Sequence, residues 1–146
     1  METVGMAILQ PVVALMAWTM VMWVWMYATR FPAMSKAKVD PKDLAGGDTG
    51  TTLDKVLPPQ VQWKAHNYNH LHEAPTLFYA VAIVIAIIGQ GDGFNLWLAW
   101  AYVALRVAHS IVQATVNNVP VRFGLFILST VALMALILHA GMAVFH

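Results

Sequence analysis

The stretch Trp63–Ile88, WKAHNYNHLHEAPTLFYAVAIVIAII, begins with a dense cluster of polar side chains and continues as an apolar run. Ionisable groups at membrane depth are costly unless they face a partner or a wet cavity, so they indicate function. The helical spacing of four polar residues predicts that they share one face, on which we expect a site. These residues are Gln62, His66, Asn69 and Glu73.

The composition is that of an integral membrane protein. Hydrophobic residues make up 60% of the 146 residues, charged residues make up 10%, and the mean hydropathy is +0.65. A water-soluble domain of this length would not have such a composition. Four apolar runs are each near the ~20 residues that a helix needs to cross the bilayer. We therefore predict an all-α four-helix bundle forming a single domain over 1–146, with spans at about 6–28, 62–88, 96–116 and 122–145.

Basic residues gather at one end of the predicted bundle. They are Arg30, Lys36, Lys38, Lys42, Lys55, Lys64 and Arg122. The positive-inside rule therefore predicts a cytoplasmic loop at 31–59 and both termini outside, which in a bacterial inner membrane means periplasmic termini. We expect the loop to be a solvated connector, with a flap over the cytoplasmic end as the alternative. The net charge of +1 gives no indication of nucleic acid, and we expect no such partner.

The third predicted span carries a second polar stripe. Its members are Tyr102, Arg106, His109, Ser110, Gln113 and Asn117, at helical spacing. Arg106 stays charged at any relevant pH, so it must face a carboxylate or water. Glu73 is the only acid within a predicted span, and we expect it to pair with Arg106 inside the bundle. Such a pair serves either as a structural clasp or as part of a cavity for a charged ligand.

Arg122 lies in the first turn of the fourth predicted span. A cation there opposes the positive end of the helix dipole, so an anionic ligand explains it better than helix stability does. A snorkelling arginine at the membrane interface is the alternative.

Three short stretches carry a resemblance to a known family: Asn69–Tyr79 (NHLHEAPTLFY), Arg106–Ser110 (RVAHS) and Pro120–Arg122 (PVR). They resemble the MAPEG family, the membrane-associated proteins of eicosanoid and glutathione metabolism, and the first stretch looks most like its bacterial members. The resemblance implies a homotrimer of four-helix subunits. It also implies glutathione bound between neighbouring subunits at the cytoplasmic end.

The resemblance further implies roles for particular residues. Arg122 matches the arginine that activates the glutathione thiol, so it is the predicted catalytic residue. Arg30, Asn69 and Glu73 match binding residues of the family. With the polar residues inferred from the two helical faces, the predicted glutathione-binding set is Arg30, His66, Asn69, Glu73, Arg106 and Gln113. The expected function is a glutathione-dependent transferase or peroxidase that acts on a hydrophobic small molecule arriving from the lipid bilayer.

Two other classes of function remain open. One is a non-catalytic protein, either a lipid-binding module or an accessory subunit of a larger membrane complex. The other is a metal-dependent enzyme that uses His66, His70 and Glu73. The chain has no cysteine, and only His109 lies deep enough to join that set, so we expect no metal site.

Overall fold

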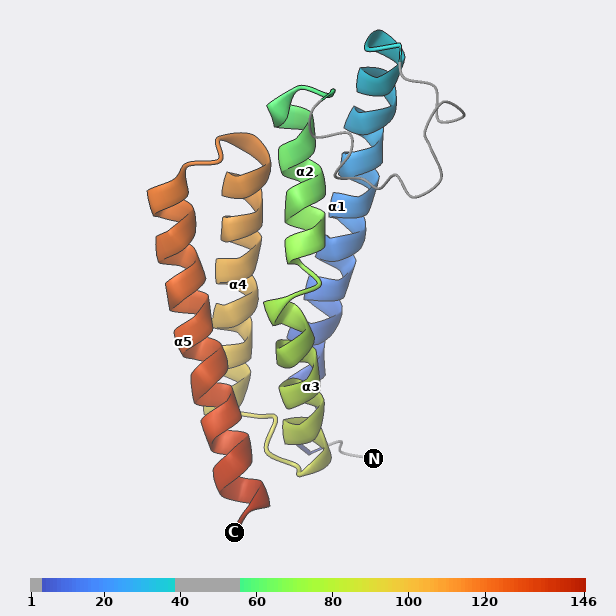
Figure 1. Cartoon of the computed structure of the whole chain (residues 1–146). Helices are drawn as coiled ribbons and strands as arrows, with labels where there is room; N and C mark the ends of the chain where they lie inside the picture. Colours follow the sequence, from blue (N-terminus) through green and yellow to red (C-terminus); the bar gives the residue numbers. More distant parts are fainter. Residues whose placement is uncertain (1–3, 39–55) are drawn as a thin grey trace.

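The computed structural model describes residues 4–38 and 56–146, and the regular structure in these ranges is entirely α-helical. The helices are α1 (Leu9–Lys36), α2 (Pro59–His70), α3 (Ala74–Ile87), α4 (Phe94–Thr115) and α5 (Val119–Val144). They run side by side in an elongated bundle, in which α3 continues the column begun by α2 (Figure 1). The predicted all-α class is confirmed.

Three helical segments of the described chain are long and apolar enough to cross a membrane. They are Leu9–Lys36, Pro59–Ile87 and Val119–Val144. Helix α4 has 22 residues, the length of a span, but its polar stripe lowers its hydropathy. Large apolar side chains such as Met20, Leu128 and Leu138 are exposed on α1 and α5. An apolar exterior of this kind suits a lipid environment.

The predicted second span, 62–88, is not one continuous helix. Helix α2 ends at His70, α3 begins at Ala74, and the backbone of Glu73 between them has φ −95° and ψ −102°. Pro75 causes this interruption. It has no N–H, its ring clashes with the carbonyl of Leu71 four residues earlier, and it disfavours helical geometry at Ala74. The break places Glu73 at the start of a new helix.

Helix α1 continues beyond the predicted end at residue 28. It includes Pro32 and reaches Lys36, so the connection to α2 is shorter than the predicted loop 31–59. Most of that loop, residues 39–55, lies outside the described residues. The alternative of a flap over the cytoplasmic end falls on these residues and stays a prediction. The ends of α1 and α4 and the starts of α2 and α5 lie at one end of the bundle (Figure 1). We call this the basic end, because Arg30, Lys36 and Arg122 come from these elements.

The opposite end is closed by close backbone contacts. The backbone N–H of Gly5 (φ +80°) donates to Oδ2 of Asp92 at 2.7 Å. A Cβ on Gly5 would come within 2.4 Å of the carbonyl carbon of Gly89, so only glycine fits at this position. In the core, the rings of Phe78 on α3 and Tyr102 on α4 are stacked with their centroids 4.5 Å apart.

Candidate functional site at the basic end

Arg122 is positioned by the turn between α4 and α5. Asn117 adopts a left-handed conformation (φ 49°), which asparagine tolerates better than most residues. The side chain of Asn118 caps α5 by accepting a hydrogen bond from the N–H of Val121 at 3.2 Å. Pro120 lies in the first turn, where its missing N–H costs nothing. Nη1 of Arg122 donates to Oδ1 of Asn117, so the turn itself directs the arginine.

A cavity of about 220 Å³ lies beside Arg122, among side chains of α2, α4 and α5. It is lined by His70, His109, Val119, Arg122, Phe123 and Phe126. We call it the Arg122 pocket. The ring centroid of His70 lies 5.1 Å from that of His109 and 6.0 Å from that of Phe126. The pocket therefore combines a guanidinium and two imidazoles with apolar side chains. In such a partly dry site these groups stabilise a developing negative charge more than they would in water.

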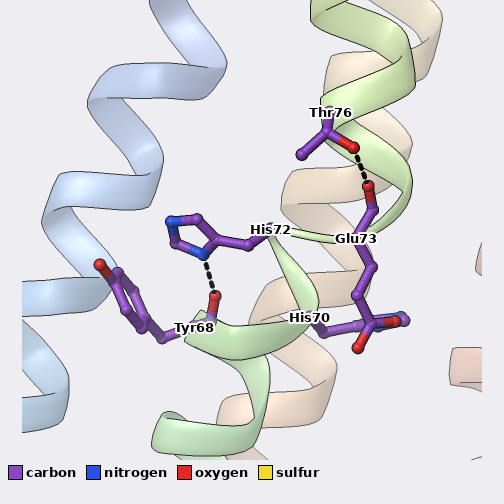
Figure 2. Close-up of polar contacts among 5 residues, drawn as sticks. All are labelled: Tyr68, His70, His72, Glu73 and Thr76. Atoms are coloured by element: carbon purple, nitrogen blue, oxygen red, sulfur yellow. Dashed lines mark hydrogen bonds and ion pairs between the residues drawn. The ribbon is translucent and has the colours of Figure 1, made fainter.

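The imidazole of His70 is oriented by the carboxylate of Glu73 (Figure 2). Nδ1 of His70 and Oε2 of Glu73 lie 2.9 Å apart, and the two side chains are 24% and 67% exposed, respectively. His72, two residues further on, points away from this pair, and its Nδ1 lies 2.9 Å from the backbone oxygen of Tyr68. His70 therefore contacts a carboxylate, whereas His72 contacts a backbone oxygen.

The expected pairing of Glu73 with Arg106 is wrong. Arg106 is 1% exposed, and none of its three guanidinium nitrogens has a hydrogen-bond partner among the described residues. The helix break turns the Glu73 carboxylate outward to His70 instead. A buried guanidinium without an acceptor is energetically costly, so Arg106 calls for a partner that these residues do not supply.

The polar stripe of α4 lies in the core, as its spacing predicts. Its buried members are Tyr102, Arg106, His109, Ser110 and Gln113. Oγ of Ser110 accepts hydrogen bonds from Nε1 of Trp18 at 2.9 Å and from Nδ2 of Asn67, which joins α4 to α1 and α2. In contrast, the hydroxyl of Tyr102, Nδ1 of His109 and Oε1 of Gln113 have no partner within residues 4–38 and 56–146. Buried polar atoms without partners are uncommon and mark candidate ligand contacts.

Arg30 reaches this end of the bundle from α1. Its Nη2 donates to Oε1 of Gln62 on α2 at 3.2 Å. Nε of Arg30 and Nε2 of Gln62 have no partner within the described ranges. Nearby, Nζ of Lys64 donates to the backbone oxygen of Ala114 near the end of α4, at 3.2 Å. Helices α1 and α2 therefore bring donors to the basic end, and α4 supplies a backbone acceptor.

The predicted binding residues differ in their exposure within the single chain. His66, Asn69 and Glu73 are exposed, whereas Arg106 and Gln113 are buried. The predicted common face of α2 is therefore divided: Gln62 is buried and the other three members are exposed.

Two residues of this region were not in the predicted glutathione-binding set. Asn67 is fully buried and contacts Ser110, but the sequence does not distinguish it from the exposed Asn69. His70 lines the Arg122 pocket. The sequence signal for His70 was its i, i+3 spacing from Glu73, which allows two side chains on a helix to meet.

The described residues also bear on the metal-dependent alternative. Within them, no three His, Cys, Asp or Glu side chains gather closely enough to hold a metal ion. His70 and Glu73 form a pair, but the nearest imidazole to them in the Arg122 pocket, that of His109, packs ring against ring with His70.

Comparison with known proteins assigns the family. Neither a curated protein nor a solved structure matches the chain. The sequence profile of the MAPEG family matches residues 8–142, which is nearly the whole chain. With its long apolar helices, the protein is therefore an integral membrane protein and belongs to the MAPEG family.

Proposed function

We propose that the protein is a glutathione-dependent transferase or peroxidase in which Arg122 stabilises the glutathione thiolate. The observation that carries this proposal is the place of Arg122 in a small, largely apolar pocket with His70 and His109, in a chain of the MAPEG family. A free thiol has a pKa of about 8.5, and the thiolate is the nucleophile. A guanidinium beside the sulfur in a partly dry site favours that anion.

The size of the Arg122 pocket limits what enters it. Its volume of about 220 Å³ is below the roughly 300 Å³ at which pockets for whole small molecules begin. It therefore suits the cysteinyl arm of the tripeptide, with the two carboxylate ends outside. The guanidinium groups of Arg30 and Arg106 have nitrogens without described partners, and they supply charge for those carboxylates.

The exposed polar residues of α2 and of the break that follows it support a homotrimer. His66, Asn69 and Glu73 face outward from the single chain at the basic end. An exposed polar group on an otherwise apolar exterior fits a neighbouring subunit better than lipid. We propose that this face completes the glutathione site between subunits, while the hydrophobic electrophile enters from the bilayer.

We also propose four membrane crossings, with α4 as the third and its polar stripe facing inward. The basic end is then cytoplasmic, and in a bacterial cell both termini are periplasmic. The described basic residues at this end, which include Lys36, Lys64 and Arg122, support this orientation. Asp92 lies at the opposite end, beside Gly5.

The function is tested on the full chain purified in detergent. Isothermal titration calorimetry should show glutathione binding, and difference ultraviolet absorbance should show the bound thiolate. Turnover of a lipophilic electrophile should then be measured with and without glutathione. If the protein neither binds glutathione nor forms the thiolate, the catalytic proposal is wrong, and a role as a lipid-binding protein or as an accessory subunit of a larger membrane complex takes its place.

A further inference from the structure

His70 combines a carboxylate partner with a place in the wall of the Arg122 pocket. It is the last residue of α2, directly before the break caused by Pro75. Nδ1 of its ring lies 2.9 Å from a carboxylate oxygen of Glu73. A carboxylate only accepts hydrogen bonds, so Nδ1 is the protonated nitrogen and donates to Glu73. In the neutral ring, Nε2 then carries the free lone pair.

The same imidazole lines the cavity that contains Arg122. Among the described residues, the charged or titratable side chains near the His70 ring are Glu73 at the helix break, His109 of α4 and Arg122 of α5. The Glu73 side chain is 67% exposed in the single chain. The apolar ring of Phe126 lies on the α5 side, 6.0 Å from the His70 ring.

We propose that His70, oriented by Glu73, is the general base that takes the proton from the thiol bound beside Arg122. The S–H bond breaks, the electron pair stays on sulfur, and the proton passes to Nε2 of His70. Arg122 stabilises the thiolate, and Glu73 stabilises the imidazolium. The thiolate then forms its bond to the electrophile. The imidazolium returns its proton to the atom of the electrophile on which negative charge develops, or to water. This inference rests on the proposed thiol chemistry.

The neighbouring histidines lack this combination. His109 shares the Arg122 pocket, but its Nδ1 has no partner among the described residues, so no carboxylate fixes its tautomer. Nδ1 of His72 donates to the backbone oxygen of Tyr68, and His72 does not line the Arg122 pocket. Only a base with an oriented ring and a neighbouring carboxylate follows the pattern of general-base histidines.

The test compares His70→Gln with His72→Gln as the matched control. Turnover and KM for glutathione are measured with one model electrophile from mildly acidic to mildly alkaline pH. We expect His70→Gln to lower kcat at neutral pH by about 10²- to 10⁴-fold, the usual contribution of a general base. KM should change much less. The loss should narrow at alkaline pH, where the thiol ionises without help. His72→Gln should keep the wild-type profile.

Glu73→Gln provides a second measurement if His70→Gln does not fold. Removing the negative charge makes the imidazolium less stable, so the acidic limb of the pH–rate profile should move to lower pH. A merely structural role for Glu73 would change the rate at all pH values without moving that limb. Wild-type rates and an unmoved pH profile in His70→Gln would overturn the role of His70 while leaving the proposed function intact. Absence of glutathione binding in the wild type would overturn both the proposed function and the role of His70.

Discussion

Oε2 of Glu73 lies 2.9 Å from Nδ1 of His70, and this local pair replaces the long-range pair expected between Glu73 and Arg106. The two side chains are three residues apart across the helix break, so little chain entropy is lost when they meet. The break also directs Glu73 outward, where 67% of its side chain is exposed. Glu73 therefore belongs to the surface of the single chain, and Arg106 belongs to its core.

The first prediction follows from that exposure. Glu73→Gln should lower the free energy of unfolding by no more than about 1 kcal/mol, because exposed ion pairs contribute little to stability. Thermal unfolding in detergent measures this. A buried Glu73–Arg106 pair would instead lose several kcal/mol when broken, so a large loss of stability in this variant would contradict the observed geometry.

The sequence predicted the structure correctly where one strong pattern determines it. Long apolar runs predicted the helices, and the spacing of Tyr102, Arg106 and Gln113 predicted the buried face of α4. The signal of Pro75 was present but was not used, because the apolar period continues through it. The spacing of apolar side chains does not show where a proline removes a backbone hydrogen bond and interrupts the helix.

The inward face of α2 could not be predicted in the same way. Both of its faces carry polar residues, so periodicity cannot choose between Asn67 and Asn69. The choice depends on a partner distant in sequence, the hydroxyl of Ser110, which accepts from Asn67. Contacts between subunits, which we propose for Asn69, also leave no trace in the sequence of one chain.

The second prediction compares these two asparagines. Asn67→Ala removes a fully buried amide that links α2 to α4, and it should lower the free energy of unfolding by about 1–3 kcal/mol. Asn69→Ala should cost less than Asn67→Ala when no ligand is present, because the Asn69 side chain is exposed in the single chain and does not link α2 to α4. Chemical denaturation in detergent measures both. Equal effects would mean that the observed rotation of α2 is wrong.

The third prediction concerns the buried guanidinium of Arg106. Arg106→Met keeps a flexible side chain of comparable volume and removes a buried charge without a described partner. The ligand-free protein should be as stable as the wild type or up to a few kcal/mol more stable, as buried ion groups replaced by apolar ones often are. The stabilisation that glutathione gives the wild type should be smaller in the variant. Melting temperatures with and without glutathione test both statements, and marked destabilisation of the ligand-free variant would contradict them.

The fourth prediction concerns orientation in the membrane. The chain has no cysteine, so a single introduced cysteine reports one position. Gln90→Cys, in the turn between α3 and α4, should react with a membrane-impermeant maleimide in intact cells. Lys36→Cys, at the end of α1, should react only after the cells are opened. The reverse pattern would place the basic end outside and contradict the proposed topology.

The last prediction concerns Arg122 and separates its charge from its structural contact. Arg122→Ala should lower turnover of a model electrophile by about 10- to 10³-fold, as expected for loss of one group that stabilises a developing anion. Glutathione affinity should change less, because the thiol is only one end of the ligand. Arg122→Lys keeps a positive charge but not the guanidinium fork, and it should retain intermediate activity.

Arg122 also donates to Oδ1 of Asn117 in the α4–α5 turn, so a loss of activity could come from that turn. Asn117→Gly is the control, because glycine suits the positive φ of this position and removes only the amide. We expect Asn117→Gly to keep most of the activity and most of the thiolate absorbance with bound glutathione. If Asn117→Gly reproduced the loss seen in Arg122→Ala, the activity would depend on the Asn117 contact that directs the guanidinium, and not on the charge of Arg122 alone.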